Sequence, residues 1–213
     1  MKDFPMFTTE YGAASLVLKE IPYKEEAYIT ILSSQEPEAL LKECVSFCRM
    51  CGAERVYAKG ESMPEGYPLQ TAVLEMVLEV HAEDTEDRLV PVTAETVGRW
   101  RSICNQRMRG VDNAATLESR DEAMILESGG AYFIYNKEET LLGIGWLRDA
   151  ELPVVAAVQP GAGERVMGAL LAPMDGKTLT LQVASTNQRA IRLYDRLGFR
   201  ETKEIRRWYR VFP

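Results

Sequence analysis

The order of strand-like and helix-like segments after residue 88 is the feature that most constrains how this chain can fold. Alternating apolar and β-branched residues predict strands, and apolar residues three or four positions apart predict helices. The order is strand, helix, helix, three strands, helix, strand, helix and strand, over residues 88–93, 94–108, 116–128, 131–137, 140–149, 152–160, 163–171, 178–186, 187–198 and 199–212. This order predicts an α/β fold with a mixed sheet.

The residues before this region predict a shorter series of the same kind. The segments are strand, strand, helix, strand and strand, over residues 13–22, 26–34, 33–52, 54–60 and 69–81. The first two strands are separated by a short polar break, which predicts a hairpin. Ser33 and Ser34 are candidate caps for the helix, and Pro37 lies near its first turn. Gly52 stands where a left-handed C-terminal cap is expected.

The acidic stretch HAEDTED, residues 81–87, is the best candidate for a linker between two domains. It is charged, poor in apolar residues and flanked by strand-like runs. We therefore expect one domain at 1–84 and a second at 85–213. Residues 1–87 contain 7 Lys and Arg against 17 Asp and Glu, whereas residues 88–213 contain 18 against 15. Two explanations account for this difference equally well. Residues 88–213 bind an anion, or the solvated surface varies in charge by chance.

Cys44, Cys48 and Cys51 have the C-x3-C-x2-C spacing with which radical S-adenosylmethionine enzymes hold an iron–sulfur cluster. Here the spacing falls on one face of the predicted helix, where thiols pack as ordinary hydrophobic side chains. The single histidine, His81, is 30 residues further on, so a fourth zinc ligand is missing. We predict no metal, no iron–sulfur cluster and four reduced cysteines.

The composition is that of a soluble globular protein, with 46% hydrophobic and 27% charged residues among 213. The first residues lack the basic start and apolar stretch of a secretion signal, and the longest apolar run, 152–158, is too short to cross a bilayer. We expect a cytoplasmic protein with no membrane partner. The net charge is -7, and the basic residues near the C-terminus alternate with acids and aromatics, so we expect no nucleic-acid partner.

The segment STNQRAIRLYDRLGF, residues 185–199, resembles the C-terminal motif of the GNAT superfamily of acetyl-CoA-dependent N-acyltransferases. The resemblance rests on Asn187, Ala190, Tyr194 and the Leu-Gly-Phe ending, and it extends to the order of elements over 88–213. It implies a mixed, mostly antiparallel sheet flanked by helices. The first half resembles a degenerate, partial β-β-α-β-β copy of the same unit, in which we expect no cofactor site.

The resemblance assigns roles to matching residues, with acetyl-CoA as the acyl donor. The strand end at 156–158 would contact the pantetheine arm, Asn187 would bond near that arm or the strand backbone, and Tyr194 would protonate the leaving thiolate. A phenol with an ordinary pKa of ~10 keeps its proton at neutral pH. The other interpretation of Tyr194 is a core aromatic. The implied catalytic residue is Tyr194, and the implied cofactor-binding residues are Ala156, Ala157, Val158, Gly161, Gly163, Glu164, Arg165, Val166, Asn187 and Tyr194.

The loop expected to bind the pyrophosphate departs from the family's pattern. It is one residue shorter, and Gly163, Arg165 and Met167 stand where three small residues are common. Backbone N–H groups and the helix dipole bind phosphate in any sequence that can form the turn. Arg165 either contacts a phosphate or fills the space that a small residue leaves open for the cofactor.

The resemblance implies an N-acyltransferase that moves an acetyl group to a primary amine of a small molecule or peptide, by direct attack in a ternary complex. The alternative is a catalytically weak or inactive coenzyme A binding or interaction module. The N–H of Val158 is the candidate donor to the thioester oxygen. Candidate bases are Glu118, Glu122, Asp149 and Glu151, and candidate pocket walls are Trp100 and Trp146. A homodimer and a monomer both remain open.

Overall fold

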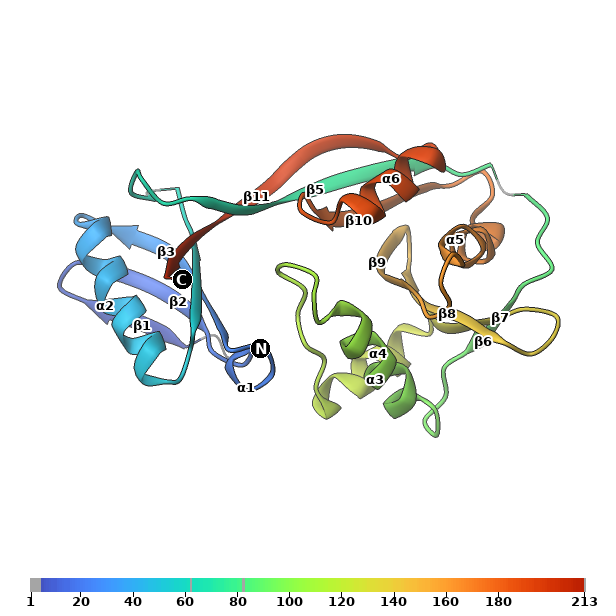
Figure 1. Ribbon diagram of the computed structural model, residues 1–213, viewed down its shortest axis with the longest axis horizontal. Coiled ribbons are helices and arrows are strands. Elements are labelled where there is room, and N and C mark those ends of the chain that lie inside the picture. The colour runs from blue at the N-terminus through green and yellow to red at the C-terminus, as the bar shows by residue number, and fades with distance from the viewer. Residues whose placement is uncertain (1–4, 62, 82, 213) are drawn as a thin grey trace. The chain divides into compact units, whose positions relative to one another are not determined.

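The computed structural model describes residues 5–61, 63–81 and 83–212, and it divides the chain into two compact units (Figure 1). Unit 1 comprises Met1–Ala72 and Ile205–Pro213, and unit 2 comprises Val73–Glu204. This division differs from the predicted boundary at residue 84. The reason is strand pairing: β5 (Leu69–Glu79) pairs with β10 (Thr178–Ala184) in unit 2, and the end of β11 (Arg200–Phe212) pairs with β4 (Arg55–Lys59) in unit 1.

Unit 1 has the strand order β1-β2-β3-β4, followed by the end of β11. Its other elements are β1 (Met6–Thr9), β2 (Gly12–Val17), α1 (Ile21–Lys24), β3 (Glu26–Ser34) and α2 (Pro37–Met50). β2 and β3 are antiparallel, as the predicted hairpin requires, and the predicted polar break between them is the short helix α1. α2 begins at Pro37 and is followed by Gly52 at a φ of 96°, as expected from the sequence. β1 was missed because four residues are too few to show a period.

The apolar face of α2 buries Leu40, Leu41, Cys44 and Cys48. Burial raises the pKa of the Cys44 thiol to about 11 and that of Cys48 to about 12. Cys51 differs from the prediction: it caps the helix end and is exposed, because the helix ends at Met50. All four cysteines are free thiols, and the described residues contain no group of three His, Cys, Asp or Glu side chains that could hold a metal ion.

Unit 2 has the strand order β11-β5-β10-β9-β8-β7-β6. Its further elements are β6 (Arg88–Pro91), α3 (Val97–Met108), α4 (Glu122–Ser128), β7 (Ala131–Tyr135), β8 (Leu141–Arg148), β9 (Glu151–Ala157), α5 (Gly163–Leu171) and α6 (Gln188–Arg196), with 3-10 turns at Ser119–Asp121 and Ala172–Met174. The strands and helices predicted from residue 88 onward are all present. None of the helices in the described part of the chain is long and apolar enough to cross a membrane.

The acidic segment 81–87 joins β5 to β6 inside unit 2, so the prediction that it links two domains is wrong. Two of its acidic residues form ion pairs within unit 2. Asp87 forms an ion pair with Arg165, and Glu86 forms one with Lys137. These pairs attach the segment to α5 and to the turn after β7.

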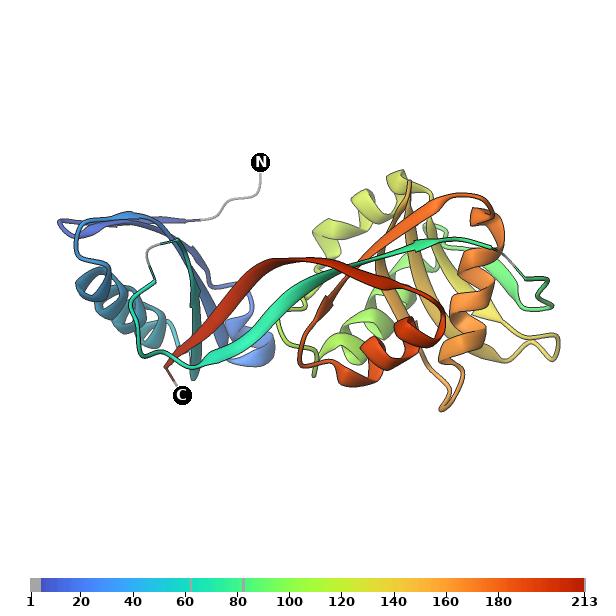
Figure 2. The same cartoon turned by 90° about the horizontal axis from the view of Figure 1, so that it is seen from above.

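Helices cover both faces of the unit 2 sheet, and Figure 2 shows α3 and α4, in green, on the opposite side of the strands from α5, in orange. α5 and α6 share one buried cluster, which includes Val166, Leu170, Leu181 and Tyr194. α3 and α4 share another, which includes Trp100, Cys104, Ile125, Trp146 and Ala156. The sheet therefore has a separate core on each face.

β9 and β10 are parallel neighbours that pair at a single described position, Thr180 with Glu151, near the start of both strands. Unit 1 has the same connection, because β2-β3-α2-β4 and β8-β9-α5-β10 are both an antiparallel pair, a helix and a parallel strand. There, however, β3 and β4 pair at five positions, from Glu26 with Arg55 to Thr30 with Lys59. The separation of the two parallel strands is therefore a feature of unit 2.

Candidate functional site

A cavity of about 690 Å³ lies in unit 2 where β9 and β10 separate. Its walls are most of β9, the end of β10, the start of α5, one side of α6, the end of α3 and the loop that follows α3. Along β9, Val154 and Ala156 pack with the core of the α3 face, whereas Val155 and Ala157 pack with the core of the α5 face. The cavity therefore has walls on both faces of the sheet.

Seven of the ten residues predicted for the site line this cavity: Ala156, Ala157, Gly161, Gly163, Glu164, Asn187 and Tyr194. They come from β9, the turn after it, the start of α5, and α6 with its N-cap, and they are up to 38 residues apart in the chain (156 to 194). The remaining three, Val158, Arg165 and Val166, are described by the structure but lie outside the wall.

Asn187 and Tyr194 are carried by α6. The Asn187 Oδ1 caps this helix by accepting a hydrogen bond from the N–H of Ala190 at 3.2 Å. Tyr194 lies two turns further on and is 7% exposed, with its ring centroid 5.6 Å from that of Phe199. It is therefore a core aromatic and a wall residue at once.

Burial raises the pKa of the Tyr194 phenol to about 12. Removing the group from water disfavours the phenolate, so the protonated form persists at neutral pH. Among the described residues the phenol has no hydrogen-bond partner. Such a phenol can donate its proton to a group in the cavity on which negative charge develops.

The backbone of β9 corrects one prediction. The N–H of Val158 donates to the carbonyl of Leu142 at 2.8 Å, so it is not free to bind a thioester oxygen. Backbone groups of successive strand residues point to opposite edges. The N–H and C=O of Ala157 therefore face the gap beside β10.

The first backbone N–H groups of α5, a helix that begins at the cavity wall, have no carbonyl partner among the described residues. The first internal bond of the helix runs from the N–H of Val166 to the carbonyl of Ala162 at 2.9 Å, so the N–H groups of residues 163–165 precede it. Gly161 makes the preceding turn at a φ of 77°, a conformation that favours glycine. At Gly163 a Cβ would lie 3.0 Å from Leu193 of α6. The turn thus forms despite the altered loop, and the helix dipole favours an anion there.

The sequence left two roles open for the Arg165 side chain: contact with a phosphate, or obstruction of the cofactor's space. The side chain does not fill the cavity. Its Nε donates to Asp87 Oδ2 at 2.9 Å, and its Nη2 donates to the other carboxylate oxygen. The bidentate pair holds the guanidinium outside the cavity wall. The neighbouring Glu164, which does line the wall, is paired with Arg196 at 2.9 Å.

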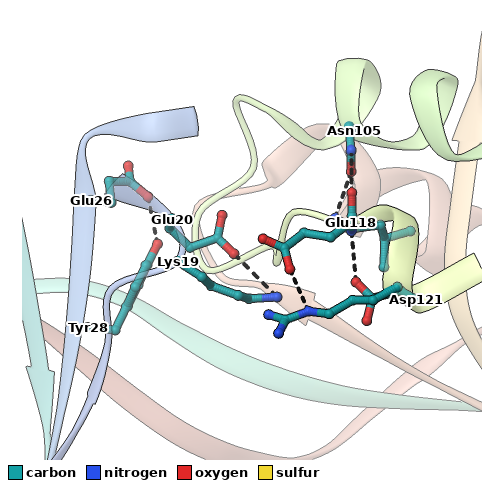
Figure 3. A network of polar contacts seen from close by, with 9 residues as sticks. Lys19, Glu20, Glu26, Tyr28, Asn105, Glu118 and Asp121 are labelled. Carbon is teal, nitrogen blue, oxygen red and sulfur yellow. Dashed lines mark hydrogen bonds and ion pairs between the residues drawn. The ribbon is translucent and has the colours of Figure 1, made fainter. Parts of the chain in front are cut away.

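The loop between α3 and α4 forms the wall on the other face, and the sequence analysis missed it. Asn105 anchors the loop, because its side chain donates to the carbonyl of Leu117 at 2.8 Å and accepts from the N–H of Leu117 at 2.9 Å (Figure 3). Glu118 and Asp121 form a capping box directly after it (Figure 3). Asp112 accepts a hydrogen bond from the Thr186 hydroxyl at 2.7 Å, which connects the loop to the segment before α6.

The four carboxylates considered as bases lie outside the cavity wall. Three are in ion pairs, Glu118 with Arg120, Glu122 with Arg101 and Glu151 with Arg148, and Asp149 makes an exposed turn at a φ of 54°. Of the two tryptophans, Trp146 lines the cavity, whereas Trp100 is core and donates to the carbonyl of Tyr132 at 3.0 Å. The charged residues that do line the loop side, Arg107 and Asp112, carry no sequence motif that could have identified them.

Residues 160–209 match the model of a family described as FR47-like protein. This segment contains α5, β10 and α6, and with them the part of the cavity wall that carries Asn187 and Tyr194. No curated protein matches the sequence significantly.

Solved structures resemble this chain over most of its length. A GCN5-related N-acetyltransferase from Sphaerobacter thermophilus is 12% identical with a TM-score of 0.55, over 94% of this chain and 77% of that one. A tandem GNAT protein from the clavulanic acid biosynthesis pathway is 16% identical with a TM-score of 0.51, over 95% and 80% of the two chains. A functionally unknown conserved protein from Staphylococcus epidermidis is 12% identical with a TM-score of 0.57, over 99% and 94%. At these identities the likeness is one of fold.

Proposed function

Because the chain has the GNAT fold that its sequence predicted, we propose that it is an N-acyltransferase. The acyl donor would be acetyl-CoA, and the acceptor would be a primary amine of a small molecule or peptide. The observation that carries this proposal is the cavity between β9 and β10, which has a protonated phenol in its wall and free N–H groups at one end. The N–H groups suit a donor that carries phosphate, and the phenol suits a leaving group on which negative charge develops.

The donor would bind on the face covered by α5 and α6. The pantetheine arm would pair with the backbone of Ala157, and the pyrophosphate would lie at the N–H groups of residues 163–165. The carboxylate of Glu164 lies at this end of the cavity, and its ion pair with Arg196 offsets the charge that would repel phosphate. Arg165 would contribute through its backbone, since Asp87 holds its side chain.

In the transfer step a neutral amine attacks the thioester carbonyl, the C–N bond forms and the C–S bond breaks. The leaving sulfur takes a proton from the Tyr194 hydroxyl, and the attacking nitrogen loses a proton that restores the phenol through solvent. The apolar surroundings that raise the pKa of Tyr194 keep it protonated until charge develops on sulfur.

Cys104 is a thiol in the cavity wall, and a thiolate there could carry the acyl group as a covalent intermediate. Burial raises its pKa to about 12, which leaves almost no thiolate at neutral pH. We therefore expect Cys104→Ala to change kcat by less than about threefold, and double-reciprocal plots with both substrates to intersect. Parallel plots together with an inactive variant would contradict direct transfer.

The experiment that tests the proposed function is calorimetric titration with acetyl-CoA, followed by an assay of coenzyme A thiol release with a panel of amines. Micromolar binding and amine-dependent thiol release are the expected results. Binding without release for any amine would favour the coenzyme A binding module. No binding would refute a donor site at α5.

We propose further that unit 1 is a degenerate copy of the fold without a cofactor site. The five paired positions of β3 and β4 leave no gap like that between β9 and β10. The segment before α2, SSQE at residues 33–36, also lacks the glycines found at the turn before α5. The cytoplasmic location, the absence of a nucleic-acid partner and the choice between monomer and homodimer stay predictions.

A further inference from the structure

The cavity in unit 2 has walls on both faces of the sheet. In the proposed function the donor occupies the side of α5 and α6. A second substrate that attacks the same carbonyl must then enter from the opposite side, between β9 and α3. The groups exposed to it there come from the end of α3 and the following loop, with Trp146 and Val154 from the sheet.

The charges on this side are few. Among the described residues, five charged side chains line the cavity: Arg107, Asp112, Glu164, Arg189 and Arg196. Glu164 and Arg196 neutralise each other, and Arg189 lies in the first turn of α6 on the donor side. The loop side is left with Arg107 and Asp112, and within the described part of the chain no carboxylate lies within ion-pair distance of Arg107.

The rest of the loop-side wall is mostly apolar. It includes Cys104, Met108, Val111, Leu117, Trp146 and Val154. An arginine in such a wall matches a carboxylate, which its guanidinium can bind through two parallel hydrogen bonds. The apolar residues match a hydrocarbon body.

We propose, on the basis of the proposed function, that the acceptor is a small amine that also carries a carboxylate and an apolar side chain, and that Arg107 binds its carboxylate. The amine lies at the thioester and the apolar side chain lies against the loop-side wall. An apolar amino acid has this chemistry. Arg107 is thus a specificity-determining residue for the acceptor.

The test compares leucine, methionine and phenylalanine with their carboxamides as acceptors, by thiol release at saturating acetyl-CoA. We expect kcat/KM to be about 10- to 100-fold higher for the acids, the range of a charged hydrogen bond. The amine of a carboxamide is more acidic and therefore more often neutral, which works against this preference. A preference for the acids thus reports recognition of the carboxylate.

The matched variants are Arg107→Gln and Arg109→Gln. Arg109 caps the same end of α3 but lies outside the cavity wall, so it controls for the loss of a charge at a helix C-terminus. We expect Arg107→Gln to raise KM for the acids by about 10-fold or more with little change in kcat, and to abolish the preference over carboxamides. Binding of N-acetyl-leucine, followed by ligand-observed NMR without acetyl-CoA, should weaken in the same variant. Arg109→Gln should match the wild type in both readouts.

The outcomes separate this inference from the proposed function. If the carboxamides, or amines without a carboxylate, are acetylated with the same kcat/KM as the acids, acyl transfer stands and the carboxylate site is refuted. If Arg107→Gln and Arg109→Gln behave alike, Arg107 is not the carboxylate ligand. If acetyl-CoA binds and no amine of either kind is acetylated, the proposed function fails and this inference fails with it.

Discussion

Replacing Tyr194 with Phe is expected to lower kcat by about 100-fold or more, the usual contribution of a positioned general acid. The affinity for acetyl-CoA should change little, because the ring keeps its packing against Phe199 and loses only the hydroxyl. Stability should also be preserved, since that hydroxyl has no hydrogen-bond partner among the described residues. The measurement is steady-state kinetics beside calorimetric titration with acetyl-CoA.

The pH dependence gives the same prediction a second readout. The pKa of Tyr194 is raised above its ordinary value to about 12, so its proton remains bound as the pH rises past 10. Ionisation of Tyr194 should therefore not lower kcat of the wild type below about pH 10. The control is Tyr132→Phe, a partly buried tyrosine packed against the same core but outside the cavity wall, which should keep its kcat within about twofold. An unchanged kcat in Tyr194→Phe would show that Tyr194 is not the general acid and only packs in the core.

Replacing Gly143 with Ala is expected to lower the free energy of unfolding by about 2 to 3 kcal/mol, the upper part of the range for overpacking a core. Gly143 lies in β8 opposite Ala157, and α5 crosses over it. A Cβ at this position would lie 2.5 Å from the carbonyl oxygen of Ala156 and 2.6 Å from Cγ2 of Val166. Relief of either contact requires β9 or α5 to move, and both are walls of the cavity. Urea denaturation measures the stability, and weaker acetyl-CoA binding should accompany its loss.

Gly168→Ala in α5 is the matched control. It adds the same methyl group to the helix that crosses β8, and nothing lies within 4 Å of the new Cβ. Alanine in a helix is favoured over glycine by about 1 kcal/mol, so this variant should be as stable as the wild type or more stable. Equal stability of Gly143→Ala and the wild type would show that β8 and α5 are further apart than in the structure.

Most of the elements could be predicted from the sequence because their signals are local. The amphipathic pattern of α6, its Asn187 cap and its Gly198 ending stand within a dozen residues, so the helix and the two cavity residues on it were correctly located. The same holds for α2, whose proline start and glycine end lie in one segment. Two further wall residues could not be connected with them: Arg107 lies in the last turn of α3 and Asp112 in the loop that follows, and neither position belongs to a sequence motif.

The residue pattern alone was enough to predict the order of strands and helices from residue 88 onward and a fold like that of the solved GNAT structures, and seven of the ten residues named from it line the cavity. The unit boundary, the partner of Arg165, the partner of the Val158 N–H and the place of the loop after α3 in the cavity wall are visible only in the folded chain. These features depend on contacts between distant segments, such as the pairing of β5 with β10 and the bond from Arg165 to Asp87, 78 residues away. Hydrophobic periodicity reports which face of an element is buried, but it does not report which distant segment buries that face. That choice is made by packing and by the pairing of strand edges and charges in the folded chain.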